Sequence, residues 1–99
     1  MFIIYLAMLG SIEDEKKFEQ LYVKYRDLMV YIANQILNDK HLSEDAVHHA
    51  FLKIINHMDG IEEIDSHKTK NFLVIVVRNL AKTMYMKRKR ETGDRKSVV

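Results

Sequence analysis

The residues with the clearest potential for chemistry lie near the C-terminal end of the chain, where cations follow an apolar run. Arg78, Lys82 and Tyr85 recur at intervals of three or four positions, which places them on one face of a helix, and Arg88 or Lys89 continues that face. Cations bind phosphates by displacing counterions, and an aromatic ring can stack on an exposed base. The pattern predicts a surface for a polyanion, whereas the simpler interpretation is a solvated helix end followed by a charged tail.

Further polar residues extend this surface to both ends of the apolar run. Lys68 and Lys70 precede the run, Asn71 stands at its start and Asn79 follows it. A lysine can neutralise a phosphate, and an amide side chain can bond to the edge of a base. We therefore expect the loop before the helix and the helix itself to share one binding surface.

The distribution of charge also points to a local anionic partner. The chain of 99 residues has a formal net charge of +2 at pH 7. Residues 78–99 hold eight Lys or Arg against two Asp or Glu, whereas residues 1–45 hold five against eight. The mild average therefore conceals a basic end, which favours a specific contact over general adhesion to anions.

The remaining polar residues do not form a catalytic or metal site by their spacing. Asp45 and His48 are three positions apart, as in the carboxylate-x-x-His element of di-iron helix bundles, but such a site needs two of these elements. The sequence contains no Ser/His/Asp set, no glycine-rich phosphate loop and no cysteine. We expect no catalytic residue, no metal, no cofactor and no enzymatic activity.

Long helices must position the binding surface. Ser11 is expected to cap a helix over 11–38, because acids follow it in the first turn and apolar residues then recur every three or four positions. A second helix is expected over 43–59, starting at Ser43, with Gly60 as its C-cap.

A third helix is expected over 67–90, with Ser66 as its cap. The run FLVIVV at 72–77 would also suit a buried strand, but no other segment alternates with period two to pair with it. The predicted fold class is therefore all-α, a compact three-helix bundle with a basic C-terminal tail.

We expect one domain over 11–92, preceded by an apolar segment over 1–10 and followed by a flexible tail over 93–99. The apolar segment is too short to span a bilayer, so it should pack on the domain or fray. The residues expected to be buried together are Leu21, Leu28, Ile32, Val47, Phe51, Ile54, Leu73, Val76, Val77 and Leu80.

Three segments, in this order, carry a resemblance to a known family: FEQLYVKYRDLMVYIANQIL, SEDAVHHAFLKI and KTKNFLVIVVRNLAKTMYMKRKR. They resemble the second conserved region of bacterial RNA polymerase sigma factors, and most closely the extracytoplasmic-function class. The resemblance covers about residues 18–90. It implies a bundle whose second helix docks on the coiled coil of the polymerase β′ subunit. It also implies that the next loop and the third helix recognise the promoter −10 element and hold its non-template strand open.

By position, the resemblance implies a set of site residues. The polymerase-binding set is Glu44, Asp45, His48 and His49. Together with the cations described above, the DNA-binding set is Lys68, Lys70, Asn71, Phe72, Arg78, Asn79, Lys82, Tyr85, Lys87, Arg88, Lys89 and Arg90. The loop over 59–70 is implied as the pocket for an extruded base, and Asp45 and His48 are expected to be exposed.

The sequence departs from the family pattern in three places, one of which is Thr83 and Met86, where Asp and Arg are common. His48 and His49 stand where the family often has Gln-Glu, and Phe72 replaces a frequent Trp but keeps a stacking face.

The implied partners are core RNA polymerase and promoter DNA in the cytoplasm, with no membrane partner, and an inhibitory anti-sigma factor is compatible with them. The C-terminal domain that binds the −35 element is expected to be absent. Two alternatives stay open: a stand-alone basic helical module for DNA or RNA, and a helical adaptor for proteins with a solubilising tail.

Overall fold

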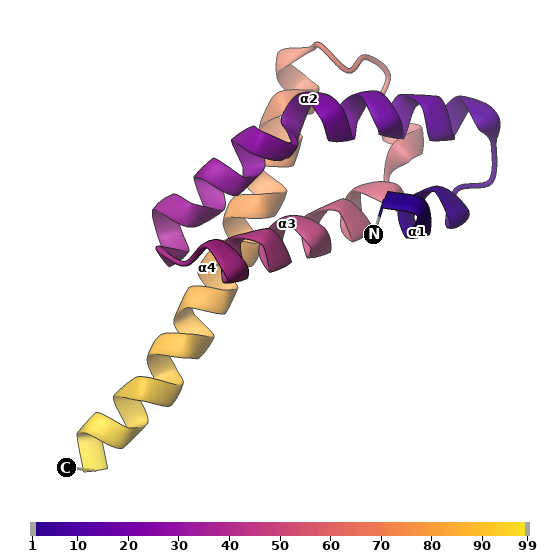
Figure 1. The fold of residues 1–99 in the computed structure, drawn as a ribbon. Coiled ribbons are helices and arrows are strands. Elements are labelled where there is room, and N and C mark those ends of the chain that lie inside the picture. Colours follow the sequence, from indigo (N-terminus) through magenta and orange to yellow (C-terminus); the bar gives the residue numbers. More distant parts are fainter. Residues whose placement is uncertain (1, 99) are drawn as a thin grey trace.

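The chain is all-α in a computed structural model that describes residues 2–98, and the side chains of residues 3–5 and 7–91. The elements in order are α1 (Phe2–Ala7), α2 (Ile12–Leu37), α3 (Lys40–Ile55), the 3-10 helix η1 (Met58–Gly60) and α4 (His67–Val98). Figure 1 shows α2, α3 and α4 packed on one another, with α1 beside α3. The predicted three-helix bundle is confirmed, and α1 adds a short helix to it.

The ends of α2 follow the prediction for 11–38. The backbone N–H of Asp14 donates to Ser11 Oγ at 3.1 Å, so Ser11 is the N-cap. The helix ends at Leu37, where Asn38 takes a left-handed conformation with φ of 50° and its N–H bonds to the carbonyl of Asn34. Asn tolerates this conformation better than most residues, which explains why the helix stops there.

The predicted bounds of α3, 43–59, are wrong at both ends. Asp39 is the N-cap, and its carboxylate accepts from the N–H of Leu42 at 3.0 Å. Ser43 lies inside the helix, fully buried, and its hydroxyl donates to the Asp39 carbonyl at 2.7 Å. The helix ends at Ile55, so Gly60 does not cap it but closes η1. Asp and Ser are equally good N-caps, and the helix begins after Asp39, the first of the two in the sequence.

Helix α4 begins at His67, as predicted, with the N–H of Thr69 bonded to Ser66 Oγ at 3.1 Å. The β-branched run is helical, and Leu73 and Val77 on its inner face are at most 1% exposed. The helix continues to Val98 and projects away from the bundle (Figure 1), so the predicted end near residue 90 is too early. The expected tail over 93–99 is only partly described, because residue 99 and the side chains of all these residues lie outside the described part of the chain. The flexibility of the tail stays a prediction.

The core lies between α2, α3 and α4. Six of the residues expected there are buried: Leu21, Val47, Phe51, Ile54, Leu73 and Val77. The other four are partly buried against this core: Leu28, Ile32, Val76 and Leu80. The sequence analysis did not place Tyr5 in the core, although it is 2% exposed and attaches the N-terminal segment to the domain. Within residues 2–98, no helix has the length and apolar character needed to cross a membrane.

Candidate nucleic-acid interface

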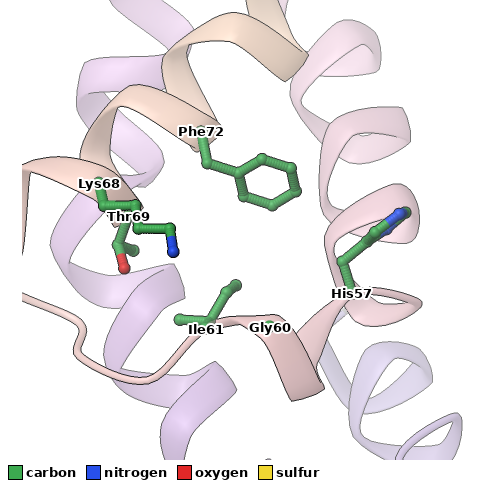
Figure 2. A pocket seen from close by; sticks show the side chains of 6 residues that line it. All are labelled: His57, Gly60, Ile61, Lys68, Thr69 and Phe72. Carbon is green, nitrogen blue, oxygen red and sulfur yellow. The ribbon is translucent and has the colours of Figure 1, made fainter.

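A pocket of about 170 Å³ lies where the loop after η1 meets the start of α4. Its lining residues are His57, Gly60, Ile61, Lys68, Thr69 and Phe72. Figure 2 shows the ring of Phe72 reaching from α4 into the space above Ile61, with Lys68 and Thr69 to one side. The Phe72 ring centroid is 5.9 Å from that of His57. The pocket therefore offers an aromatic face with polar groups at its edge, inside the loop expected to receive a base.

Helix α2 holds the outer side of this loop. The ammonium of Lys17 donates to the carbonyl of Ile61, one of the residues that line the pocket. The buried Tyr25 donates its hydroxyl proton to the carbonyl of Ile64 at 2.6 Å. Two backbone carbonyls of the loop are thus fixed from a neighbouring helix, which limits how far the pocket rim can move.

The first turn of α4 holds the inner side of the loop. Thr69 is 4% exposed and donates its hydroxyl proton to the carbonyl of Glu63. Ser66 Oγ lies 3.1 Å from Thr69 Oγ1 and 3.2 Å from the same carbonyl oxygen. An exposed ion pair between Lys24 and Asp65 adds a further link to α2. The carbonyl of Glu63 and the side chain of Asp65 therefore tie the loop to α4 and α2.

The predicted DNA-binding residues lie on two connected parts of the molecule. The exposed members in the first half of α4 are Lys68, Lys70, Asn71, Arg78, Asn79 and Lys82, and Phe72 is half-buried in the pocket. The expectation that Lys68 and Lys70 belong to the loop before the helix is wrong, because α4 begins at His67. Tyr85 is 37% exposed, with the Lys89 ammonium 6.0 Å from its ring centroid. The pocket and the exposed cations thus share one continuous helix.

Arg88 differs from the cations around it. Its guanidinium donates to the carbonyl of Leu37, the last residue of α2, at 2.8 Å, and its side chain is half-buried. A cation at the C-terminal end of a helix is favourable because unpaired carbonyls gather there. Lys87, Lys89 and Arg90 are exposed. Arg88 therefore has a structural contact that its spacing did not reveal.

The predicted polymerase-binding residues lie together on α3, with different exposures. Asp45 and His49 are exposed, as Asp45 was expected to be. Glu44 is half-buried, and its carboxylate lies 3.5 Å from the guanidinium of Arg26 on α2. Glu44 is therefore partly neutralised within the domain, whereas Asp45 and His49 face solvent.

The expectation that His48 is exposed is wrong. It is half-buried because Tyr5 of α1 covers it, with the hydroxyl 2.6 Å from Nδ1 and the ring centroids 5.5 Å apart. Burial raises the pKa of Tyr5 to about 12. The hydroxyl therefore keeps its proton at neutral pH and can donate it to Nδ1. The spacing of residues on α3 could not show this contact, since its other partner lies 43 positions away.

A groove of about 470 Å³ separates α3 from the second half of α4. Its lining residues are Leu42, Asp45, His49, Met84, Lys87, Arg88 and Glu91. The predicted polymerase-binding and DNA-binding sets therefore adjoin across this groove. Among the described residues, no group of three or more His, Asp or Glu side chains could hold a metal ion.

One of three comparisons with known proteins finds a match. The family model described as Sigma-70 region 2 matches residues 21–91, which include α3, the pocket and α4 as far as Glu91. No curated protein and no solved structure matches the chain. The family match covers well over half of the sequence, and it starts after α1. The chain therefore belongs to the sigma-70 region 2 family, a non-enzymatic family of transcription initiation whose role is promoter recognition.

Proposed function

We propose that this chain is the −10 recognition and strand-opening domain of a sigma factor of the extracytoplasmic-function class, which directs RNA polymerase to start transcription. The observation that carries the proposal is the continuity of pocket and cations on α4. Phe72 stands in the pocket, and the exposed Arg78 and Lys82 follow on the same helix. A base taken out of its stack needs an aromatic face, and its strand needs cations beside the phosphates.

The proposed roles divide by the chemistry of the side chains. Phe72 stacks on the extruded base, and the ammonium of Lys68 lies at the rim, where a phosphate would pass. The exposed Arg78 and Lys82 position further phosphates without regard to sequence. The exposed amide of Asn79 can donate to and accept from a base edge, so it is the proposed reader of sequence.

We also propose that α3 docks on the β′ coiled coil of the polymerase, with Asp45 and His49 as exposed contacts. Electrostatic binding to DNA alone gives a Kd of only about 10⁻⁴–10⁻⁶ M at physiological salt. Unpairing a base costs a few kcal/mol, which is similar to the roughly 1–3 kcal/mol that stacking it returns. The domain by itself therefore lacks the free energy to open a duplex, and we place its activity in the cytoplasm, on the polymerase.

Fork-junction DNA binding with and without core polymerase tests the proposal. We expect tight binding only with the polymerase, and only to forks that carry the matched −10 non-template strand. Phe72→Ala should weaken this binding by about 1–3 kcal/mol, because it removes the stacking face. Tyr31→Ala, at an exposed aromatic residue of α2 outside both proposed sites, is the matched control.

Two results would favour the alternatives. Equal binding with and without polymerase, with duplex DNA competing as well as the fork, would support a stand-alone basic module. A domain that binds the polymerase while Phe72→Ala and the promoter sequence have no effect would support a protein adaptor.

The base-reading role of Asn79 needs a separate measurement. Asn79→Ala should reduce discrimination between matched and mismatched −10 strands by about 1–3 kcal/mol, because it removes an amide that can bond to a base edge. Gln35→Ala, at an exposed amide on α2, should leave discrimination unchanged. If Asn79→Ala weakened binding to both strands equally, the residue would act only as a positioning contact.

A further inference from the structure

The short helix α1 lies over the part of α3 that carries His48. Tyr5 is 2% exposed and inserts among three aromatic rings, those of Phe18, Tyr22 and Phe51, with centroid distances of 5.3, 6.0 and 5.9 Å. Its hydroxyl is 2.6 Å from His48 Nδ1. Tyr5 therefore packs against aromatic rings of α2 and α3 and bonds to Nδ1 of His48, the neighbour of the proposed contact His49 on α3.

Among the side chains of α1 that the structure describes, Tyr5 is the one that is buried in the bundle. It has six residues, fewer than an isolated helix needs to be stable, so its structure depends on its contacts with the bundle. Those contacts are mainly with α3, and Figure 1 shows α1 beside the C-terminal half of that helix. Ile3 and Ile4 point outward, 78% and 54% exposed. Among the described side chains, Tyr5 therefore anchors α1, while Ile3 and Ile4 face solvent.

The family match also separates α1 from the rest of the domain. The match covers α2 from Leu21, α3 and α4 as far as Glu91, and α1 lies before it. The three long helices α2, α3 and α4 contact one another far more extensively than α1 contacts any of them.

We propose that α1 is a displaceable cover on the polymerase-docking face, closed while Tyr5 lies over His48 and open when the polymerase binds. This inference rests on the proposed docking role of α3. If the open state is about 1–10% populated, the cover lowers the apparent affinity for the polymerase about 10- to 100-fold. Only a partner that prefers the open state can shift this equilibrium.

Binding of the full chain to core polymerase tests the cover. Tyr5→Ala removes the ring and the hydroxyl, and we expect it to tighten binding at least tenfold. Tyr5→Phe keeps the ring but loses the bond to His48, and we expect a smaller gain of a few fold. Ile3→Ala changes the outward side of the same helix and should leave the affinity unchanged.

The opposite pattern would overturn the proposal. If Tyr5→Ala and Ile3→Ala both weakened binding, α1 would be part of the docking surface. If the wild-type chain bound and neither Tyr5 variant changed the affinity, the cover would be refuted while the docking role stood. If no form of the chain bound the polymerase, the proposed function and the cover would both fail.

If Tyr5→Ala does not fold, hydrogen exchange of the α1 amides in the wild-type chain tests whether α1 leaves the bundle when the polymerase binds. We expect these amides to exchange faster when polymerase is added to the wild-type chain, because α1 leaves the bundle. The amides of α4 near Val77 report on the fold and should keep their protection. Slower exchange of α1 on polymerase binding would refute the cover.

Discussion

The two halves of α4 carry cations of the same kind in different surroundings. The first half is built into the bundle, with Leu73, Val77 and Ala81 at most 1% exposed. The second half projects beyond it (Figure 1), and among residues 85–91 only Arg88 is half-buried. One helix therefore joins a fixed surface to an extended, solvated one.

Under the proposed function, this difference predicts two kinds of contact with DNA. A pocket held by buried side chains and hydrogen bonds can select a shape, because its groups stay in place when the ligand is absent. Exposed cations on a projecting helix attract phosphates of any sequence. Variants of the pocket and of the buried residues in the first half should therefore change stability and base selection. Variants of the exposed cations, of which the second half holds most, should change the dependence of binding on salt.

The largest contrast concerns apolar residues. Leu73→Ala should lower the free energy of unfolding by about 2–5 kcal/mol, because it leaves a cavity in the core. Met86→Ala, at a residue that is 59% exposed, should change it by less than about 0.5 kcal/mol. Urea denaturation followed by circular dichroism measures both. Similar losses in the two variants would mean that the second half of α4 is packed as well as the first.

A smaller contrast uses the two threonines of α4. Thr69→Val removes a buried hydroxyl that bonds to the loop carbonyl of Glu63, and we expect a loss of about 1–3 kcal/mol. Thr83→Val removes an exposed hydroxyl that donates to the Asn79 carbonyl at 3.0 Å, which water can replace. Its effect should stay within about 0.5 kcal/mol.

The same two threonine variants test whether binding at the pocket depends on the hydrogen bond between Thr69 and the loop carbonyl of Glu63. Thr69→Val should also reduce affinity for forks with the matched −10 strand, while Thr83→Val should not. An unchanged fork affinity in Thr69→Val would show that the pocket does not need this hydrogen bond.

A third contrast compares two neighbouring cations in the second half of α4, Arg88 and Lys87. Arg88→Ala should lower the free energy of unfolding by about 1 kcal/mol, because its guanidinium bonds to the carbonyl that ends α2. Lys87→Ala, one position earlier and exposed, should leave stability unchanged. Equal stabilities would mean that Arg88 does not hold α4 to α2 in solution.

Much of the fold could be predicted because local patterns agreed with the packing. The three-and-four spacing of apolar residues identified each long helix, and the run at 72–77 had no strand to pair with. The predicted start of α3 was wrong because only Ser43 was expected as its cap, whereas Asp39, a residue equally suited to capping, is the N-cap. Only the packing of the Ser43 hydroxyl inside the bundle distinguishes them, and no local pattern contains that information.

The site was predictable where it depends on one helix and not where helices meet. Spacing placed Arg78 and Lys82 on an exposed surface, which the structure confirms. It could not show that Tyr5 covers His48 or that Arg88 reaches Leu37. The partners in those bonds are 43 and 51 positions apart, so their contacts depend on how whole helices pack.

The smallest expected effect is a change in how steeply the affinity for DNA falls as the salt concentration rises. Lys87 is exposed in the projecting half of α4, and its proposed role is to neutralise one phosphate. Lys87→Ala should therefore flatten the dependence of log affinity on log salt by roughly 0.7–0.9, for matched and mismatched forks alike. The measurement is fork binding by the domain with core polymerase at several salt concentrations, with Lys16→Ala, an exposed lysine of α2, as control. A change confined to the matched fork would place Lys87 at a base edge and erase the distinction between the two halves of the helix.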